Sequence, residues 1–200
     1  GRALSVEEIS RWTVLRRLLE CCFICNNARL EKTGSDYKIL GDPTEGALVC
    51  LAEKGGIRGI HQRLSVHPFE SVRKRMSVVV KLEKENARTI YVKGAPLETL
   101  QVCDRIVSEG KVLSLDEHER QKIIVQNDRM ASCGLRVLAL AYKDASELEE
   151  KGPNRAEDVE NGLVFLGLAA MSDPIRAEVP QAIHACHTAG IRVVMITGGY

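Results

Sequence analysis

The sequence predicts an α+β fold, and three patterns in the chain predict it. Two β-rich runs, RMSVVVKLE and ARTIYVKG, are separated by the polar EKEN, as is typical of an antiparallel hairpin. Amphipathic helical segments flank this hairpin. From about residue 161 the pattern changes to strand, helix and continuous apolar strand, which indicates a parallel βαβ unit. We therefore expect one domain over residues 1–160 and part of an α/β domain over residues 161–200.

Composition places the chain among globular proteins and excludes some partners. The chain has 200 residues, 44% of them hydrophobic, and a net charge of +1 from 28 basic and 27 acidic residues. This even mixture gives no field that would attract nucleic acid or an anionic bilayer. The longest apolar run, around Leu163 to Met171, is far shorter than the ~20 residues that cross a membrane. We expect a soluble chain that does not itself span a membrane and has no signal peptide at its start.

In the first half, local signals predict two helices. Ser5 and Glu8 form a capping box ahead of apolar residues at helical spacing, which predicts a helix ending near Asn26. Asp42 and Pro43 have the residue types of an N-cap and a first helical position, and Gly55 or Gly56 closes that second helix after residue 54.

After the hairpin, Pro96 starts a short helix, and a longer one is predicted from Ser114 to near Gly134 with Glu117 completing a capping box. The strand LRVLALAYK follows. The polar residues 144–162 are predicted to be a surface excursion. The βαβ unit then comprises a strand over residues 163–170, a helix ending at Gly190 and the strand IRVVMIT.

The seven cysteines are best explained as reduced thiols. Their number is odd, and most lie in apolar helical or strand patterns. CCFIC and HACH contain metal-binding residue types, but neither belongs to two CxxC pairs in the spacing CxxC…CxxC. We expect no metal site.

The chain has no glycine-rich phosphate loop of either common type, GxxxxGK[ST] or GxGxxG after a strand. A nucleotide would therefore have to be bound by side chains. The candidates are Phe69, with Lys74 and Met76 after it, and Lys93 with Gly94. An aromatic face could stack on a base, lysines could meet phosphates, and a glycine could let the backbone come close. The alternative is that Phe69 is a core residue and the RKR at 73–75 a solvated turn.

Five motifs in order carry a family resemblance. GDPTEGAL, HPFESVRKRMSVVVK, YVKGAP, GLRVLALAYK, and DPIR with AGIRVVMITG resemble the cytoplasmic region of a P-type cation-transporting ATPase of the calcium and sodium/potassium pump branch. The resemblance covers nearly the whole chain from Leu18 onward. It implies a nucleotide-binding domain, built as a twisted antiparallel sheet flanked by helices, and a short βαβ piece of a phosphorylation domain of haloacid-dehalogenase-like fold.

The resemblance also implies roles for single residues. Phe69 would stack on adenine, Glu45 would accept a hydrogen bond from the adenine amino group, and Arg136 would reach the phosphates. Lys74, Lys93 and Met76 would line the pocket, while Asp173, Thr197 and Gly198 would contact nucleotide and phosphate from the phosphorylation domain. Each has a plain structural alternative: Glu45 completing a cap with Asp42, Arg136 as a surface charge, Asp173 as a helix cap, and Thr197 as a strand-end residue.

EKTGS, Glu31 to Ser35, differs in two side chains from the DKTGT that such pumps phosphorylate. The glutamate side chain of Glu31 is one methylene longer than aspartate, which would move the carboxylate by roughly 1.5 Å, and a displacement of ~1 Å can lower the rate a hundredfold. EKTGS also lies only about ten residues before GDPTE, whereas DKTGT in the family lies much farther upstream, so we expect a surface loop. The chain therefore has no catalytic residue for phosphoryl transfer.

We predict the ATP-binding domain of a cation pump, with Mg²⁺ acting in the intact enzyme. Its partners would be ATP and the phosphorylation, actuator and transmembrane domains, on the cytoplasmic face of a membrane. Three alternatives stay open: a stand-alone nucleotide-binding regulatory module without catalysis, a small phosphatase of the dehalogenase-like class, and a purely structural interaction domain. The phosphatase would need an Asp-x-Asp after a strand, which is absent.

Overall fold

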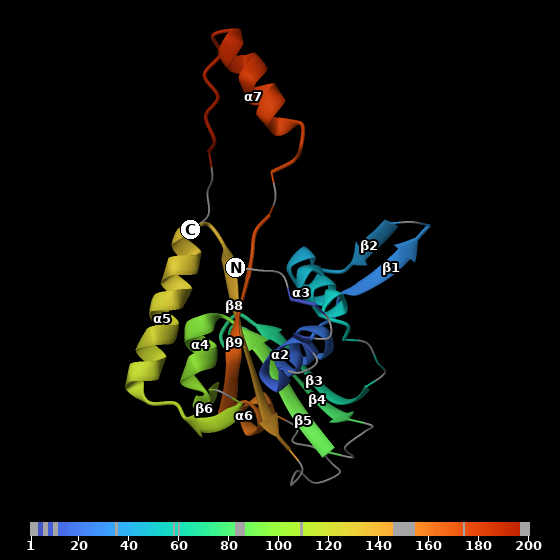
Figure 1. Cartoon of the computed structure of the whole chain (residues 1–200), viewed down its shortest axis with the longest axis vertical. Coiled ribbons are helices and arrows are strands. Elements are labelled where there is room, and N and C mark those ends of the chain that lie inside the picture. Colours follow the sequence, from blue (N-terminus) through green and yellow to red (C-terminus); the bar gives the residue numbers. More distant parts are fainter. Residues whose placement is uncertain are drawn as a thin grey trace.

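A mixed sheet forms the centre of the computed structural model, which describes residues 4–5, 8–9, 12–34, 36–57, 59, 61–82, 87–108, 110–145, 155–173 and 175–196 (Figure 1). Within these residues the sheet has seven strands in the order β3-β4-β5-β8-β9-β6-β7. All neighbours are antiparallel except β6 and β9, which are parallel. The strands are β3 (Gln62–Glu70), β4 (Arg75–Leu82), β5 (Ala87–Gly94), β8 (Arg136–Asp144), β9 (Leu163–Met171), β6 (Cys103–Ser108) and β7 (Lys111–Ser114).

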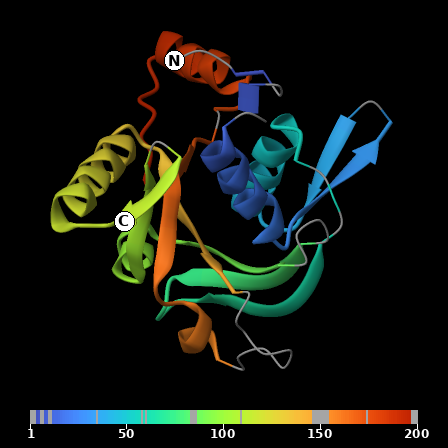
Figure 2. The same ribbon diagram turned by 60° about the horizontal axis from the view of Figure 1, so that its bottom comes forward.

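Helices cover both faces of this sheet, as Figure 2 shows. On one face, α2 (Thr13–Ile24) and α3 (Pro43–Lys54) pack against Val78 and Tyr91. On the other, α4 (Pro96–Gln101), α5 (Glu117–Ser132) and α6 (Ala156–Val159) pack against Val79 and Val92. Consecutive strand residues thus belong to opposite cores, because side chains alternate along a strand. The prediction of an α+β sheet flanked by helices is confirmed.

The local signals for α3 and α4 are also confirmed. α3 begins at Pro43, and the Asp42 carboxylate accepts a hydrogen bond from the Glu45 N–H at 3.1 Å. α4 begins at Pro96, directly after β5. The two β-rich runs pair as antiparallel β4 and β5. These features were predictable because caps and period-two strands depend on neighbouring residues alone.

One predicted helix start is confirmed and one is wrong. Ser5 and Glu8 form a reciprocal capping box, at 2.9 and 3.2 Å, and residues 8 and 9 are helical. Trp12 is non-helical and exposed, however, so the predicted single helix is interrupted before α2 begins at Thr13. The long helix α5 begins at Glu117, where the side chain of Asp116 accepts from the Glu119 N–H at 2.8 Å. Ser114, the predicted cap, instead ends strand β7.

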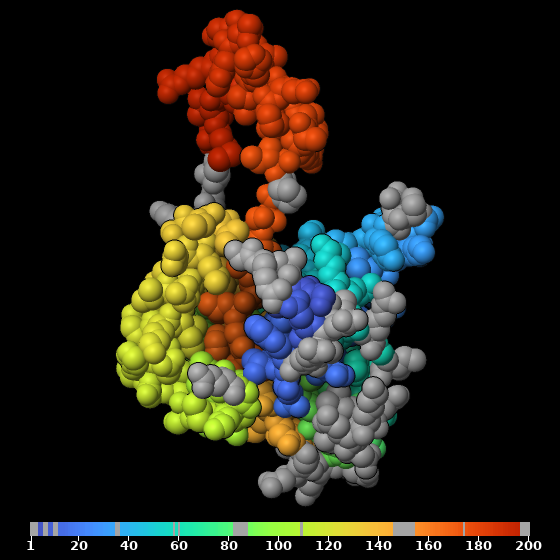
Figure 3. Space-filling model, viewed as in Figure 1, coloured from blue at the N-terminus to red at the C-terminus, as the bar shows by residue number. Residues whose placement is uncertain are grey.

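A separate two-stranded hairpin projects from the body of the molecule (Figures 1 and 3). It consists of β1 (Arg29–Thr33) and β2 (Asp36–Leu40), with Glu31 opposite Lys38. Most of EKTGS therefore belongs to an exposed strand and its turn, where Gly34 has φ of 64°. The motif lies at the surface as expected, but in a hairpin, which the sequence analysis did not predict.

The prediction that a separate unit begins at residue 161 is wrong for the first strand of that unit. β9 lies within the seven-stranded sheet, antiparallel to β8 and parallel to β6. Leu163, Val164 and Phe165 are buried there between the two helical layers. A strand buried on both faces has a continuous apolar sequence whichever way its neighbours run, so the pattern alone did not distinguish this sheet from a parallel one.

The segment after β9 leaves the sheet. α7 (Val179–Thr188) stands apart from the body in Figures 1 and 3, and none of its residues is buried. Its end before Gly190 agrees with the prediction. The second strand of the predicted βαβ unit is not present over residues 191–196, which are exposed and belong to no strand. Thr197, its last predicted residue, lies outside the described residues.

No helix in the described part of the chain has the length and apolar character needed to cross a membrane.

Two shortened chains test which residue ends the sheet. A chain ending at Met171 should keep its fold, because the sheet and both cores remain complete. A chain ending at Glu160 should lose ~5 kcal/mol or more of unfolding free energy, because removal of β9 leaves β8 and β6 unpaired and opens both cores. Urea unfolding followed by circular dichroism measures both. Equal stability of the two chains would contradict the assignment of β9 to this sheet.

Candidate functional site

Three of the predicted site residues lie side by side on the sheet face that α3 covers. Met76 of β4 is paired with Lys93 of β5, and both side chains lie on that face. A bulge between His67 and Glu70 of β3 places two residues opposite Met76. Because His67 and Glu70 both pair with residues of the opposite face, the bulge turns Phe69 toward the side of Met76 and Lys93.

An ion pair joins this row to the beginning of α3. The Lys93 ammonium lies 2.6 Å from Oε1 of Glu45, with side chains only 8% and 18% exposed, respectively. Oε2 of Glu45 accepts a hydrogen bond from the Asn27 backbone N–H at 3.1 Å. The pair is therefore shielded from bulk solvent but reachable at its edge, where electrostatic interactions are stronger than in water.

The structure confirms the capping interpretation of Glu45 for its backbone only. Its backbone N–H is the donor to the Asp42 cap, and this hydrogen bond holds the pKa of Asp42 below its usual value. Its carboxylate is engaged elsewhere, with Lys93 and Asn27. The backbone of Glu45 thus caps the helix start, while its side chain belongs to the ion pair with Lys93.

Phe69 is a surface residue, 62% exposed, so the alternative that it belongs to the core is wrong. The alternative of a solvated RKR turn is wrong for the two arginines. Arg73 and Arg75 are largely covered, and both bind the buried carboxylate of Glu160. An exposed aromatic ring on an ordered strand is the kind of surface on which a base can stack.

Lys74 and Gly94 lie at the rim, beside α4. The Lys74 ammonium is 2.6 Å from a Glu98 carboxylate oxygen, and this contact lowers the pKa of Glu98. A Cβ on Gly94 would lie 2.5 Å from the Arg75 Cβ and 2.6 Å from the Lys74 carbonyl oxygen. The space that the glycine leaves is therefore filled by the chain itself.

Met76 forms the floor beneath the pair. It is buried, its carbonyl accepts from the Cys25 thiol at 3.4 Å, and its sulfur is 3.9 Å from the Asn27 side-chain nitrogen. Burial raises the pKa of Cys25 to about 12, which keeps the thiol protonated. Among the described residues no three of His, Cys, Asp and Glu gather as a metal site would require.

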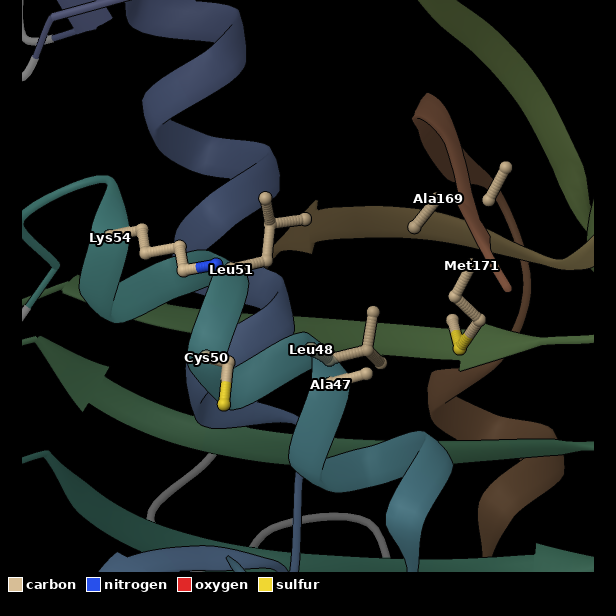
Figure 4. Close-up of a pocket in the computed structure, with 8 residues that line it drawn as sticks. Ala47, Leu48, Cys50, Leu51, Lys54, Ala169 and Met171 are labelled. Carbon is tan, nitrogen blue, oxygen red and sulfur yellow. The ribbon is translucent and has the colours of Figure 1, made fainter. Parts of the chain in front are cut away.

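A hollow of about 390 Å³ brings Arg136 and Asp173 together at the beginning of α3. Arg136 donates to the Thr44 hydroxyl at 2.6 Å, and its strand position, opposite Met171, places it on the same sheet face as Lys93. An apolar hollow of about 310 Å³ lies next to it, where Leu48 and Leu51 of α3 face the end of β9 (Figure 4). The other two predicted contacts, residues 197 and 198, lie outside the described residues.

Sequence reasoning missed four residues that shape the site: Asn27, Thr44, Glu98 and Glu160. Thr44 was adjacent to a predicted residue, and Glu98 followed a predicted helix start, so local inspection could have proposed both. Glu160 lies 85 and 87 residues from its arginine partners, in a polar segment that resembles surface. No local signal marks it.

A family model and the named relatives that match this chain all describe ATPases. The family model described as P-type ATPase, cytoplasmic domain N, matches residues 14–178. A protein named cation-transporting ATPase pma1, from Synechocystis, is 40% identical over 94% of this chain and 20% of its own length. A calcium-transporting ATPase from Bacillus subtilis is 36% identical over 93% and 21%, and the human calcium-transporting ATPase type 2C member 1 is 34% identical over 91% and 18%. The chain thus spans about a fifth of these relatives.

The fit around Gly94 gives a stability prediction. Gly94→Ala should lower the unfolding free energy by about 1–3 kcal/mol, because its methyl group would overlap backbone and Cβ atoms. Gly110→Asn is a suitable control, since Gly110 has open space and an αL-type φ of 79° that asparagine tolerates. Urea unfolding measures both, and an unchanged midpoint for Gly94→Ala would contradict the contact.

Proposed function

The chain belongs to the P-type ATPase cytoplasmic domain N family, and from this premise we propose that it binds ATP by its adenine and presents the γ-phosphate to an aspartate outside these 200 residues. The observation that carries the proposal is the exposed ring of Phe69 on β3, separated only by Met76 of β4 from the shielded Glu45–Lys93 pair. An aromatic face and a polar pair on one sheet face suit a base that needs both stacking and an edge contact.

Each adenine contact follows from the chemistry of one group. Phe69 supplies a stacking surface that contributes ~1–3 kcal/mol per base. Within the described residues each Glu45 oxygen has one hydrogen-bond partner, which leaves lone pairs to accept a hydrogen bond from the exocyclic amino group of adenine. Guanine has a carbonyl oxygen at that position, so an ionised Glu45 repels it. This arrangement favours ATP over GTP.

The phosphates would extend from the Phe69 row toward the Arg136 hollow. Lys93 lies next to the base contacts, and Lys74 at the rim would exchange Glu98 for a phosphate oxygen. Arg136, which now binds the neutral Thr44 hydroxyl, has donors left for a second partner. Asp173 lies in the same hollow, where we place it near the transferred phosphate. Residues 197 and 198 keep their proposed phosphate contacts.

We further propose how the chain fits a complete pump. The residues after β9, from about 172, would belong to the phosphorylation domain, which moves the boundary from residue 160 to the end of the sheet. The relatives' names support cation transport by the whole protein, with calcium as the cation in two of them. Its other partners would be the actuator and transmembrane domains, and its place the cytoplasmic face of a membrane. We assign no Mg²⁺ ligand to the described residues, since no acidic cluster is formed there.

Calorimetric titration with ATP tests the adenine site. The chain should bind ATP with a millimolar or lower dissociation constant, and Phe69→Ala should weaken binding about fivefold or more, because stacking is lost. Tyr37→Ala is the matched control, since Tyr37 is a comparably exposed aromatic residue on the remote β1–β2 hairpin. GTP should bind more weakly than ATP. Equal loss in both variants, or none in Phe69→Ala, would refute the assignment of Phe69.

The chain alone should not hydrolyse ATP. Phosphoryl transfer needs a carboxylate held in line with the γ-phosphate, and Glu31 of EKTGS lies instead on an exposed hairpin. Phosphate release in the presence of Mg²⁺ should equal the buffer blank for the chain and for Glu31→Gln. Steady release that Glu31→Gln abolishes would assign a nucleophile that we exclude.

A further inference from the structure

Glu160 is a buried carboxylate on the sheet face opposite the proposed nucleotide site. Its side chain is 0% exposed and follows the short helix α6. Oε1 accepts from Arg73 at 2.5 Å and from the Ser77 hydroxyl at 2.8 Å, and Oε2 accepts from the Arg75 Nε at 2.8 Å. These three donors all come from the β3–β4 turn and the beginning of β4. A buried charge with such partners fixes their positions, because each lost contact would leave it uncompensated.

Arg73 connects Glu160 to both neighbours of Phe69. Besides binding Glu160, its guanidinium donates to the Pro68 carbonyl at 2.8 Å and to the Glu70 carboxylate at 3.0 Å. Three partners at three different nitrogens require the planar fork of arginine, which lysine lacks. Pro68 lies within the bulge that turns Phe69 toward the site face, and Glu70 ends it. Arg73 thus holds this bulge closed from the opposite side of the sheet.

Arg75 extends the same network to Lys74. Its NH1 donates to the Arg73 carbonyl at 3.2 Å, beside α4, whose Glu98 carboxylate holds the Lys74 ammonium. Lys74 has φ of 49°, the one positive value among non-glycine residues in the described part of the chain. Such a conformation is strained for a residue with a Cβ and persists only where its surroundings impose it. Hydrogen bonds from Lys74 N–H to Glu70, and from Ala95 N–H to Lys74, impose it here.

We propose that Glu160 is a positioning residue for nucleotide binding: through Arg73 and Arg75 it holds the β3–β4 turn in the shape that presents Phe69 and Lys74. The inference rests on the proposed function for its consequence, and on the contacts above for its mechanism. A turn held before the ligand arrives does not have to be ordered on binding, and ordering mobile side chains opposes binding. Without the clamp formed by Glu160, Arg73 and Arg75, ordering the turn would make the free energy of nucleotide binding less favourable.

Two variants of the full chain test the clamp. Arg73→Lys keeps the charge but cannot hold Glu160, Pro68 and Glu70 together. Glu160→Gln removes the charge that attracts both arginines and is the more severe change. Arg129→Lys is the matched control, because Arg129 is exposed on α5. Ile123→Ala is the stability control, since it weakens the core under α5 without changing a clamp residue.

Two readouts are compared. Without nucleotide, ¹⁵N relaxation should show greater motion at Phe69 and Lys74 in Arg73→Lys and Glu160→Gln than in either control. With ATP, both clamp variants should have a dissociation constant about three- to tenfold higher, in proportion to the ordering cost. Ile123→Ala should lose stability but keep its affinity, which separates positioning from general destabilisation. If Glu160→Gln does not fold, Arg73→Lys decides.

The outcomes distinguish this inference from the proposed function. Unchanged turn motion in Arg73→Lys, or an ATP affinity within twofold of the parent, overturns the positioning role. Equal loss of affinity in Ile123→Ala also overturns it. If the parent chain binds no ATP, the proposed function fails, and the nucleotide-free relaxation alone then decides whether Glu160 orders the turn.

Discussion

A sheet covered on both faces must send alternate side chains to two different layers, and the rest of this structure depends on that constraint. Along β4, Met76 faces the proposed nucleotide site, while its neighbours Arg75 and Ser77 face Glu160 on the other side. The site and the clamp are therefore built on consecutive residues of the same strand. Neither can shift register without moving the other, since a one-residue slip would exchange the two faces.

The two faces use charge differently. Glu160 is buried completely and has three donors, an arrangement that is costly to break and that fixes a backbone segment. The Glu45–Lys93 pair has fewer partners and lies at a solvent-reachable edge. It keeps capacity for an added hydrogen bond, as a ligand site requires. The Glu160 network thus stabilises the shape of a turn, and the Glu45–Lys93 pair is suited to exchange with a ligand.

How far the sequence could predict the structure depended on the distance between interacting residues. The α3 cap at Asp42 and the β4–β5 hairpin were predictable because their determinants lie within a few residues. β9 was assigned to the wrong unit because an apolar run does not specify its neighbours' direction. The candidate residues of the first unit were found through motif resemblance, and the structure places Glu45, Met76 and Lys93 in one connected cluster.

By itself, then, the sequence determined local elements, the α+β class and most candidate ligand-binding side chains. Only the tertiary structure decided three things: that Phe69 is exposed, that β9 completes the sheet, and that Glu160 is buried beneath the β3–β4 turn. The physical reason is that all three depend on contacts between segments far apart in the chain. A bulge decides which face Phe69 occupies, and a carboxylate 87 residues away from Arg73 helps to hold that bulge.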